Sequence, residues 1–162
     1  MSETYTTVPS PVGELLLTAE DGRLTGLYMP SDRYARHAAA HPGAARRDDA
    51  AFAAVRRQLE EYFAGERSSF DLPVAPAGTA FQQGVWSELQ RIGYGTTITY
   101  AELAGRIGRP TAIRAAGAAN GANPVSIVIP CHRVIGSNGT LTGYGGGLEA
   151  KRFLLDLERA GA

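Results

Sequence analysis

A segment containing two prolines and a glycine, Phe70 to Thr79, divides this chain of 162 residues into parts with different hydrophobic patterns. No helical stripe of apolar residues runs through this segment, so it is typical of a connection. We therefore expect an N-terminal domain over residues 1–79, with 70–79 as its linker, and a second domain over residues 80–162. Hydrophobic residues make up 44% of the chain and charged residues 20%, which excludes wholesale disorder.

The first part carries the patterns of strands followed by one helix. Asp21-Gly22 lies between the apolar stretches 14–19 and 23–29, and this dipeptide is typical of a two-residue hairpin turn. Apolar residues at alternate positions of the first stretch predict a strand with one buried face. A helical period then runs over residues 49–65, and its predicted inward face is Phe52, Val55, Leu59, Tyr62 and Phe63.

The second part begins with a helix over residues 80–92 and continues with two shorter ones. Thr99 and Glu102 fit a capping box, which starts the first short helix. Gly108-Arg109-Pro110 ends that helix, and Thr111 is the predicted cap of a second one that runs to Ala119. Two short helices joined by a glycine-containing turn indicate a helix-turn-helix, an arrangement that also occurs in proteins that bind no DNA.

The second of these short helices consists almost entirely of small residues, with Arg114 as the exception. A helix that reads base edges in the major groove needs longer polar side chains. Small side chains instead permit close approach, either in tight packing or in docking to a narrow groove with one probing arginine. The net charge is +0, but residues 1–79 hold 8 arginines against 11 acids, whereas the basic excess lies in residues 80–162. Such a small asymmetry gives only weak support for a polyanionic partner.

Cys131 is the only cysteine, which excludes an internal disulfide framework and a cysteine-cluster zinc site. The β-branched run Val125–Ile129 predicts a buried strand that ends at Pro130, so the thiol lies where this strand emerges. A lone cysteine is usually a small buried apolar residue. Here His132 and Arg133 follow it directly, and such neighbours favour the reactive thiolate. A glycine-rich segment after them suits close approach of a flat ligand.

Successive side chains of a strand point to opposite faces, so His132 would not touch the thiol directly. Either the backbone turns at this point or a water bridges the two groups. A cysteine protease is disfavoured, because the other histidines, His37 and His41, lie in the N-terminal part. These two stand four residues apart, but no third metal ligand is evident nearby. We interpret them as exposed histidines and predict no metal site.

The sequence Ile129-Pro130-Cys131-His132-Arg133-Val134-Ile135-Gly136, preceded by Asn123-Pro124 and followed by residues 143–147, resembles the O6-alkylguanine-DNA alkyltransferases. The resemblance extends in register from Phe81 to Glu158 and more loosely through the N-terminal part. It implies an α+β fold, with an N-terminal domain built on an antiparallel sheet and a mostly helical C-terminal domain with a winged helix-turn-helix. It also implies irreversible transfer of an alkyl group from guanine O6, and possible activity on thymine O4, with no cofactor.

In such a protein Cys131 would accept the alkyl group, and His132 would act on the thiol through a bound water. Glu158 matches the acid that orients this histidine. Asn123 matches the asparagine that braces the turn before the reactive segment. Tyr100 matches the tyrosine that contacts the flipped base and assists proton movement.

The resemblance also implies binding residues. Arg114 would fill the gap left by the extruded nucleotide, alongside the small residues Ala112, Ala115 and Gly117. Val134 would meet the guanine edge through its backbone. The remaining matches line the alkyl pocket or lie near it, and they are Tyr144, Gly145, Gly146 and Lys151.

The implied partner is double-stranded DNA that contains O6-alkylguanine. We expect a cytoplasmic monomer without a membrane segment, and cooperative binding of several copies to DNA stays open. Two alternatives belong to other classes of protein. One is a non-catalytic protein that binds alkylated bases and recruits another pathway. The other is a winged-helix regulator in which Cys131 senses oxidants.

Overall fold

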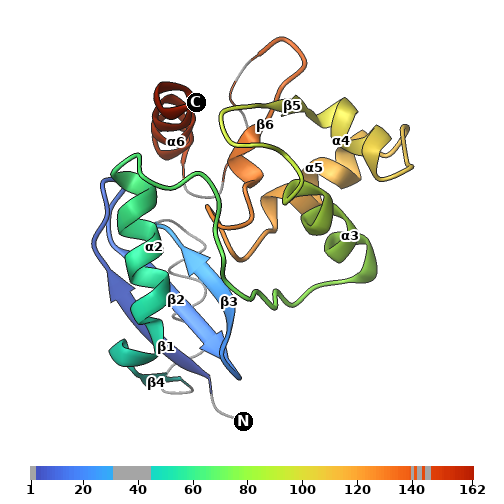
Figure 1. Ribbon diagram of the computed structural model, residues 1–162. Helices are drawn as coiled ribbons and strands as arrows, with labels where there is room; N and C mark the ends of the chain where they lie inside the picture. The colour runs from blue at the N-terminus through green and yellow to red at the C-terminus, as the bar shows by residue number, and fades with distance from the viewer. Residues whose placement is uncertain (1–2, 31–44, 140, 142–143, 145–146) are drawn as a thin grey trace.

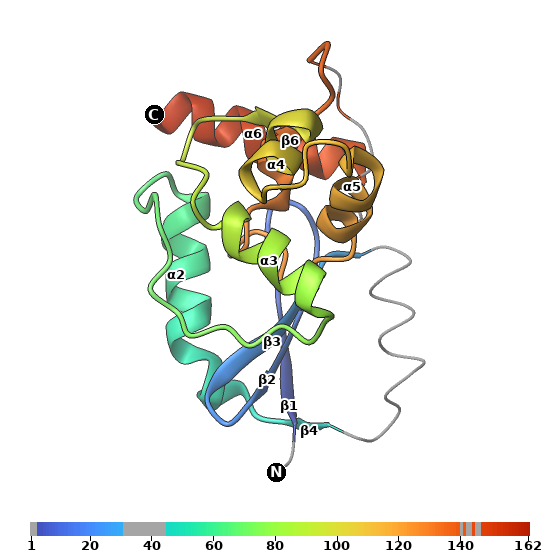
Figure 2. The same cartoon turned by 90° about the vertical axis from the view of Figure 1, so that its right-hand side faces the viewer.

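The computed structural model describes residues 3–30, 45–139, 141, 144 and 147–162. Among the described residues, a small sheet with helix α2 (Ala53–Phe63) forms one end of the molecule, and five helical segments after residue 79 form the other (Figure 1). The N-terminus lies at the sheet end and the C-terminus at the opposite end in both views (Figures 1 and 2). One buried apolar cluster contains side chains from both ends, so the two parts pack on a shared core.

The sheet has the strand order β3-β2-β1-β4. Strands β1 (Thr4–Val8), β2 (Leu15–Glu20) and β3 (Arg23–Tyr28) are antiparallel, and the short β4 (Arg46–Arg47) joins β1 in parallel. Asp21 and Gly22 connect β2 to β3 with φ angles of 54° and 76°. Two successive positive φ angles are what a tight hairpin turn requires, so the predicted hairpin is confirmed.

The prediction that β2 has only one buried face is wrong. Leu15, Leu16, Leu17 and Thr18 are all buried. Leu15 and Leu17 belong to the main core, and helix α2 (Ala53–Phe63) crosses one face of the sheet (Figure 1). Leu16 and Thr18 point to the other face because side chains alternate along a strand. Both faces of β2 are therefore covered, which local alternation could not reveal.

Helix α2 (Ala53–Phe63) follows a short 3₁₀ turn, η1 (Asp49–Phe52). The side chain of Asp48 caps this turn by accepting a hydrogen bond from the Ala51 backbone. The predicted stripe faces inward, with all its members buried except Phe63, which is half-buried.

The connecting segment 70–79 is held along the outer edge of β3. The Leu24 backbone donates to Pro73 and accepts from Ala75, at 2.9 and 2.8 Å. Further along the same edge, Leu27 donates to Pro124 and accepts from Ser126. The loop that precedes Cys131 is thus fixed to the N-terminal sheet, and this edge of the sheet is protected from pairing with other strands.

Helices α3 (Ala80–Leu89), α4 (Tyr100–Arg106) and α5 (Ile113–Gly121) pack against one another, as Figure 2 shows. The predicted capping box of Thr99 and Glu102 is confirmed. The predicted Thr111 cap is wrong, because α5 begins one residue later, with Ala112 at its N-cap and no side-chain cap. The backbone already turns at this point, where Ala112 donates to the Arg109 carbonyl.

The predicted strand over 125–129 is also wrong. This segment forms overlapping turns, in which Ile129 donates to the Val125 carbonyl at 3.0 Å. Ile127 has a φ of 71°, a left-handed conformation that is strained for a β-branched residue. Four of its five residues are buried and Val128 is half-buried, so its apolar composition reflects packing in the core, and within the segment only Val125 forms an isolated bridge, to Leu27.

Two short strands, β5 (Ile98–Thr99) and β6 (Val134–Ile135), pair in parallel in the second part. The last element of the chain is helix α6 (Leu148–Gly161). Leu154 and Leu155 are the buried leucines of α6, whereas Phe153 is 39% exposed. Within the described residues, no helix is long and apolar enough to cross a membrane.

Candidate active site

Cys131 opens a 3₁₀ turn, η2 (Cys131–Arg133), and its side chain is only 3% exposed. The Cys131 backbone donates to Ile129 at 2.8 Å, and its carbonyl accepts from Asn120 Nδ2 at 3.3 Å. The backbone therefore turns at the cysteine, which is one of the two geometries that the sequence left open. Because Cys131 and His132 do not lie in a strand, the alternation of side chains along a strand does not apply to them.

Asn123 fixes the turns that lead to the cysteine. Its buried side chain accepts from the Val125 backbone at 3.0 Å and donates to Ile129 O at 2.8 Å. These bonds span the segment with the strained Ile127, and they give that segment a single shape. The side chain thus holds the turns directly before Cys131 in place.

Glu158 is the centre of a buried polar cluster that it forms with Tyr62 and with the adjacent residues His132 and Arg133. Its Oε2 lies 2.7 Å from His132 Nε2 and accepts from the Tyr62 hydroxyl at 2.6 Å. Arg133 binds both carboxylate oxygens, with Nε 2.8 Å from Oε1 and Nη2 3.0 Å from Oε2. All four side chains are buried, so water screens these interactions little.

The buried surroundings determine the charges of Glu158 and His132. Burial would raise the pKa of Glu158, but hydrogen bonds from His132, Arg133 and Tyr62 more than offset it and hold that pKa well below its usual range. Burial lowers the pKa of His132, against the opposing effect of Glu158. At neutral pH the glutamate is therefore anionic and the histidine neutral.

The tautomer of His132 follows from the same geometry. A carboxylate only accepts hydrogen bonds, so Nε2 must carry the imidazole proton. Nδ1 is then unprotonated, and among the described residues it has no hydrogen-bond partner. The second ring nitrogen is thus available to accept a proton.

Lys151 occupies the opposite side of the reactive segment. Its Nζ donates to the Val134 carbonyl at 2.7 Å and lies 5.9 Å from the centre of the Tyr100 ring. Burial lowers the pKa of Lys151, and the nearby Cys131 thiol opposes that shift. This buried lysine therefore connects the cysteine to two of the predicted base-binding residues.

Helix α5 presents small residues to solvent beside this site. Arg114 and Ala115 are exposed, and Ala112 and Gly117 are half-buried. A Cβ at Gly117 would lie 3.5 Å from the Tyr100 ring, which shows how closely the two helices approach. Arg114 makes no ion pair with any residue that the structure describes.

Tyr144 is half-buried and packs against the core. The predicted pocket residues Gly145 and Gly146 lie outside the described residues, as do His37 and His41. Within the described ranges no three His, Cys, Asp or Glu side chains are grouped closely enough to hold a metal ion.

Three residues around Cys131 and Glu158 have contacts that the sequence did not predict. Tyr62 was predicted only as a core residue, and nothing local indicates that its hydroxyl reaches a carboxylate 96 positions away. Arg133 was considered only as a charge next to the thiol. Asn120, which binds the Cys131 carbonyl, follows directly on the predicted second short helix and was assigned no role.

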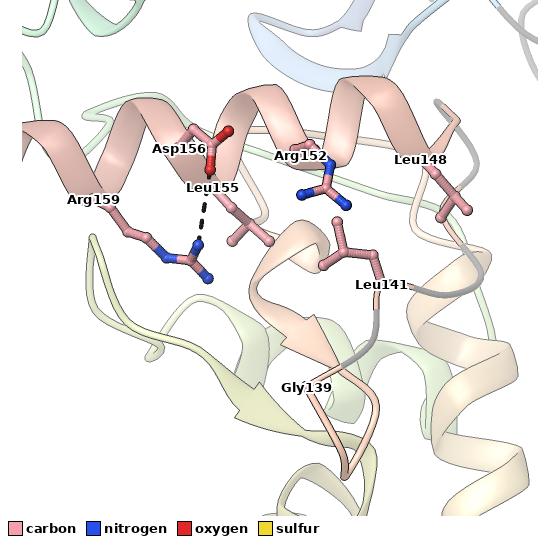
Figure 3. Close-up of a pocket in the computed structure, with 7 residues that line it drawn as sticks. All are labelled: Gly139, Leu141, Leu148, Arg152, Leu155, Asp156 and Arg159. Atoms are coloured by element: carbon pink, nitrogen blue, oxygen red, sulfur yellow. Dashed lines mark ion pairs between the residues drawn. The ribbon is translucent and has the colours of Figure 1, made fainter.

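A separate groove of about 400 Å³ lies on the outer side of α6 (Figure 3). Leu141 and Leu155 point toward each other across it, and Arg159 pairs with Asp156 at its rim. Neither Cys131 nor any member of the Glu158 cluster lines this groove. The groove is therefore separate from the buried thiol.

Residues 80–160 match the family model of the 6-O-methylguanine DNA methyltransferase DNA binding domain, and residues 4–76 match that of its ribonuclease-like domain. The methylated-DNA–protein-cysteine methyltransferase of Haemophilus influenzae is 49% identical over 157 residues, covering 96% of this chain and 86% of the relative. The constitutive enzyme of that name from Bacillus subtilis is 44% identical over 156 residues, covering 96% and 94%.

A crystal structure of Mycobacterium tuberculosis OGT in complex with DNA superposes with a TM-score of 0.89 at 46% identity, covering 98% of this chain and 94% of that one. The chain belongs to the family of 6-O-methylguanine DNA methyltransferases. Within it, the chain is similar over nearly its whole length to the proteins named methylated-DNA–protein-cysteine methyltransferase. The predicted family and the α+β fold with a winged helix-turn-helix are thereby confirmed.

Proposed function

We propose that this protein repairs alkylated double-stranded DNA by moving the alkyl group from guanine O6 to Sγ of Cys131, once per protein molecule. The observation that carries this proposal is the buried Cys131 followed by a neutral His132 whose Nε2 is held by Glu158 and whose Nδ1 is open. A thiol needs such a base to become a thiolate, which is the attacking species.

The residues support a step in which atoms and charges balance. His132 Nδ1 takes the thiol proton through a bound water, and Glu158 stabilises the imidazolium that forms. Sγ forms a bond to the alkyl carbon while the bond from that carbon to O6 breaks, and its electrons return to the guanine. Tyr100 donates a proton to the departing guanine and regains one from the imidazolium through solvent. The products are a thioether at Cys131 and unmodified guanine.

The depth of the cysteine requires the target base to leave the duplex. A thiol that is 3% exposed cannot reach O6 of a stacked guanine. In our proposal α5 enters the minor groove with Ala112, Ala115 and Gly117, whose small side chains allow close approach. Arg114 fills the space that the flipped nucleotide leaves, which offsets part of the unstacking cost.

The flipped base then meets residues that surround the thiol. Tyr100 contacts the base, and the backbone of Val134 meets the guanine edge beside Lys151. Tyr144, Gly145 and Gly146 would line the pocket for the alkyl group. Asn123 maintains the turn that presents Cys131 to this pocket. The positive charge of Lys151 lies near Cys131, where it favours the thiolate.

We infer further that residues 1–79 and residues 80–162 are two domains packed on one core, with one repair site in the second. The protein would work as a monomer on DNA that contains O6-alkylguanine, without a metal or organic cofactor. We place it in the cytoplasm, where a lone cysteine stays reduced.

The experiment that tests the function is mass spectrometry of the intact protein after incubation with a duplex that contains one O6-methylguanine. The expected result is a mass increase of one methyl group, located on the Cys131 peptide, with guanine restored in the DNA. A Cys131→Ala variant should bind the duplex and gain no mass. Unchanged wild-type mass with retained lesion binding would overturn the proposal in favour of a non-catalytic binder. Sequence-selective binding without a lesion would favour a regulator.

A further inference from the structure

The Tyr62 hydroxyl is the only contact to Glu158 in the described residues that comes from the N-terminal part. Tyr62 belongs to the inward stripe of α2 and is fully buried. Its oxygen lies 2.6 Å from Glu158 Oε2, across 96 positions of sequence. The N-terminal part, which contains no other member of the reactive cluster, thus touches the carboxylate directly.

The bonded oxygen is the one that also binds the histidine. Oε2 accepts from Tyr62, from His132 Nε2 and from Arg133 Nη2, whereas Oε1 accepts from Arg133 Nε and, at 3.4 Å, from the Gly95 backbone. The two carboxylate oxygens therefore have different surroundings. The tyrosine and the arginine together keep Oε2, and not Oε1, in place against the imidazole.

Packing by itself does not require this hydroxyl. The Tyr62 ring lies 5.3 Å from the rings of Phe63 and Phe70 and 6.4 Å from that of Tyr94. A phenylalanine would fill the same space in this aromatic cluster. Burial and the nearby Glu158 charge raise the pKa of Tyr62 far above its usual value, so the hydroxyl stays protonated and always donates.

We propose that Tyr62 is a positioning residue for alkyl transfer, through which the N-terminal domain holds Glu158 Oε2 against His132. This inference rests on the proposed function, because it gives Tyr62 a part in the activation of Cys131. Tyr62 touches neither thiol nor substrate in this scheme. It acts on the tautomer of His132, since only a histidine protonated at Nε2 leaves Nδ1 free to accept the thiol proton.

Loss of the hydroxyl has two consequences that can be measured. Without one of its three donors, Oε2 is held less firmly, and part of the His132 population takes the tautomer protonated at Nδ1. The pKa of Glu158 also rises, because a hydrogen bond to the charged form has been removed. The other charged or titratable groups that face this carboxylate are His132, Arg133 and Tyr94, and they stay in place.

The test compares Tyr62→Phe with Tyr94→Phe, which removes a hydroxyl from the same aromatic cluster without removing a donor to Glu158. We expect single-turnover methyl transfer to slow about tenfold in Tyr62→Phe at neutral pH, in line with loss of a hydrogen bond to a charged group. The acid limb of its pH–rate profile should move to higher pH. Tyr94→Phe should match the wild type in both respects.

Nitrogen NMR of His132 supplies a readout that does not depend on transfer. The wild type should show Nε2 protonated and Nδ1 bare, and Tyr62→Phe should show a mixture of tautomers. In a Glu158→Gln background, the Tyr62→Phe change should cause no further loss of rate. Thermal melting and lesion binding in the Cys131→Ala background control for damage to the fold.

The outcomes separate the two proposals. A wild-type protein that accepts no methyl group overturns the proposed function, whatever the Tyr62 variant does. A wild type that transfers normally, with an unchanged rate and unchanged His132 tautomer in Tyr62→Phe, overturns the role of Tyr62 alone. Equal slowing in Tyr94→Phe, or slowing that only follows a lower melting temperature, also overturns that role.

Discussion

Arg133 and Glu158 form a two-point ion pair in the interior of the protein, with nitrogen–oxygen distances of 2.8 and 3.0 Å. Arg133 also donates to the Ile92 carbonyl at 2.6 Å, so the guanidinium is held by a backbone as well as by the acid. The residue directly after the histidine therefore stabilises the carboxylate that orients that histidine.

Replacement of Arg133 by alanine should destabilise the protein by about 3–5 kcal/mol, because it leaves Glu158 charged and only partly compensated in the interior. Chemical denaturation measures this change. Arg159→Ala is the matched control, since its pair with Asp156 is exposed and should contribute less than about 1 kcal/mol. Equal effects of the two substitutions would contradict the interpretation of Arg133.

Glu158→Gln should slow methyl transfer by about a hundredfold, because a neutral amide stabilises the His132 imidazolium poorly. Affinity for the lesion should change little, since Glu158 is buried away from the surface of α5. Single-turnover kinetics and equilibrium binding measure the two quantities. A transfer rate equal to that of the wild type would remove Glu158 from the mechanism.

Stability should fall as the pH is lowered. The pKa of His132 lies below 6.5 and that of Glu158 below 4.5 in the folded protein, so the unfolded chain binds more protons than the folded one. Stability is therefore complete above about pH 6.5, decreases below it and decreases further below about pH 4.5. Thermal melting across this range, compared with Glu158→Gln, measures the effect. The variant should lose the lower part of this dependence, and identical curves would contradict the assignment.

Arg114→Ala should reduce transfer from duplex DNA about tenfold while transfer from free O6-methylguanine stays unchanged, because only the duplex requires a flipped base. Arg109→Ala provides a control, since this exposed arginine precedes α5. Equal loss with both substrates would place Arg114 in the thiol chemistry and not in base flipping.

Asn123→Ala should destabilise the protein by roughly 1–3 kcal/mol, because it leaves the buried Val125 amide without its acceptor and removes one of the two donors to the Ile129 carbonyl. It should also slow methyl transfer by changing the position of Cys131. Denaturation and single-turnover kinetics measure the two effects. Wild-type values in both would show that the turn over 125–129 does not depend on Asn123.

Several local elements were predictable because their causes lie within a few residues. The Asp21-Gly22 turn, the capping box of Thr99 and Glu102 and the stripe of α2 all follow from backbone geometry and helical period. The errors occurred where tertiary contacts decided the outcome. The apolar run 125–129 forms turns because Asn123 and the edge of β3 bind its backbone.

The sequence by itself determined the family and the candidate nucleophile, because Cys131 and its neighbours are contiguous in the chain. Through the family resemblance it also indicated Glu158 as the candidate acid for His132. Only the tertiary structure decided how that acid is held, since Tyr62 and Glu158 meet from positions 96 residues apart. The free energy of a buried polar contact depends on which groups the fold buries next to one another. When these groups are far apart in the sequence, a local sequence pattern does not predict that contact.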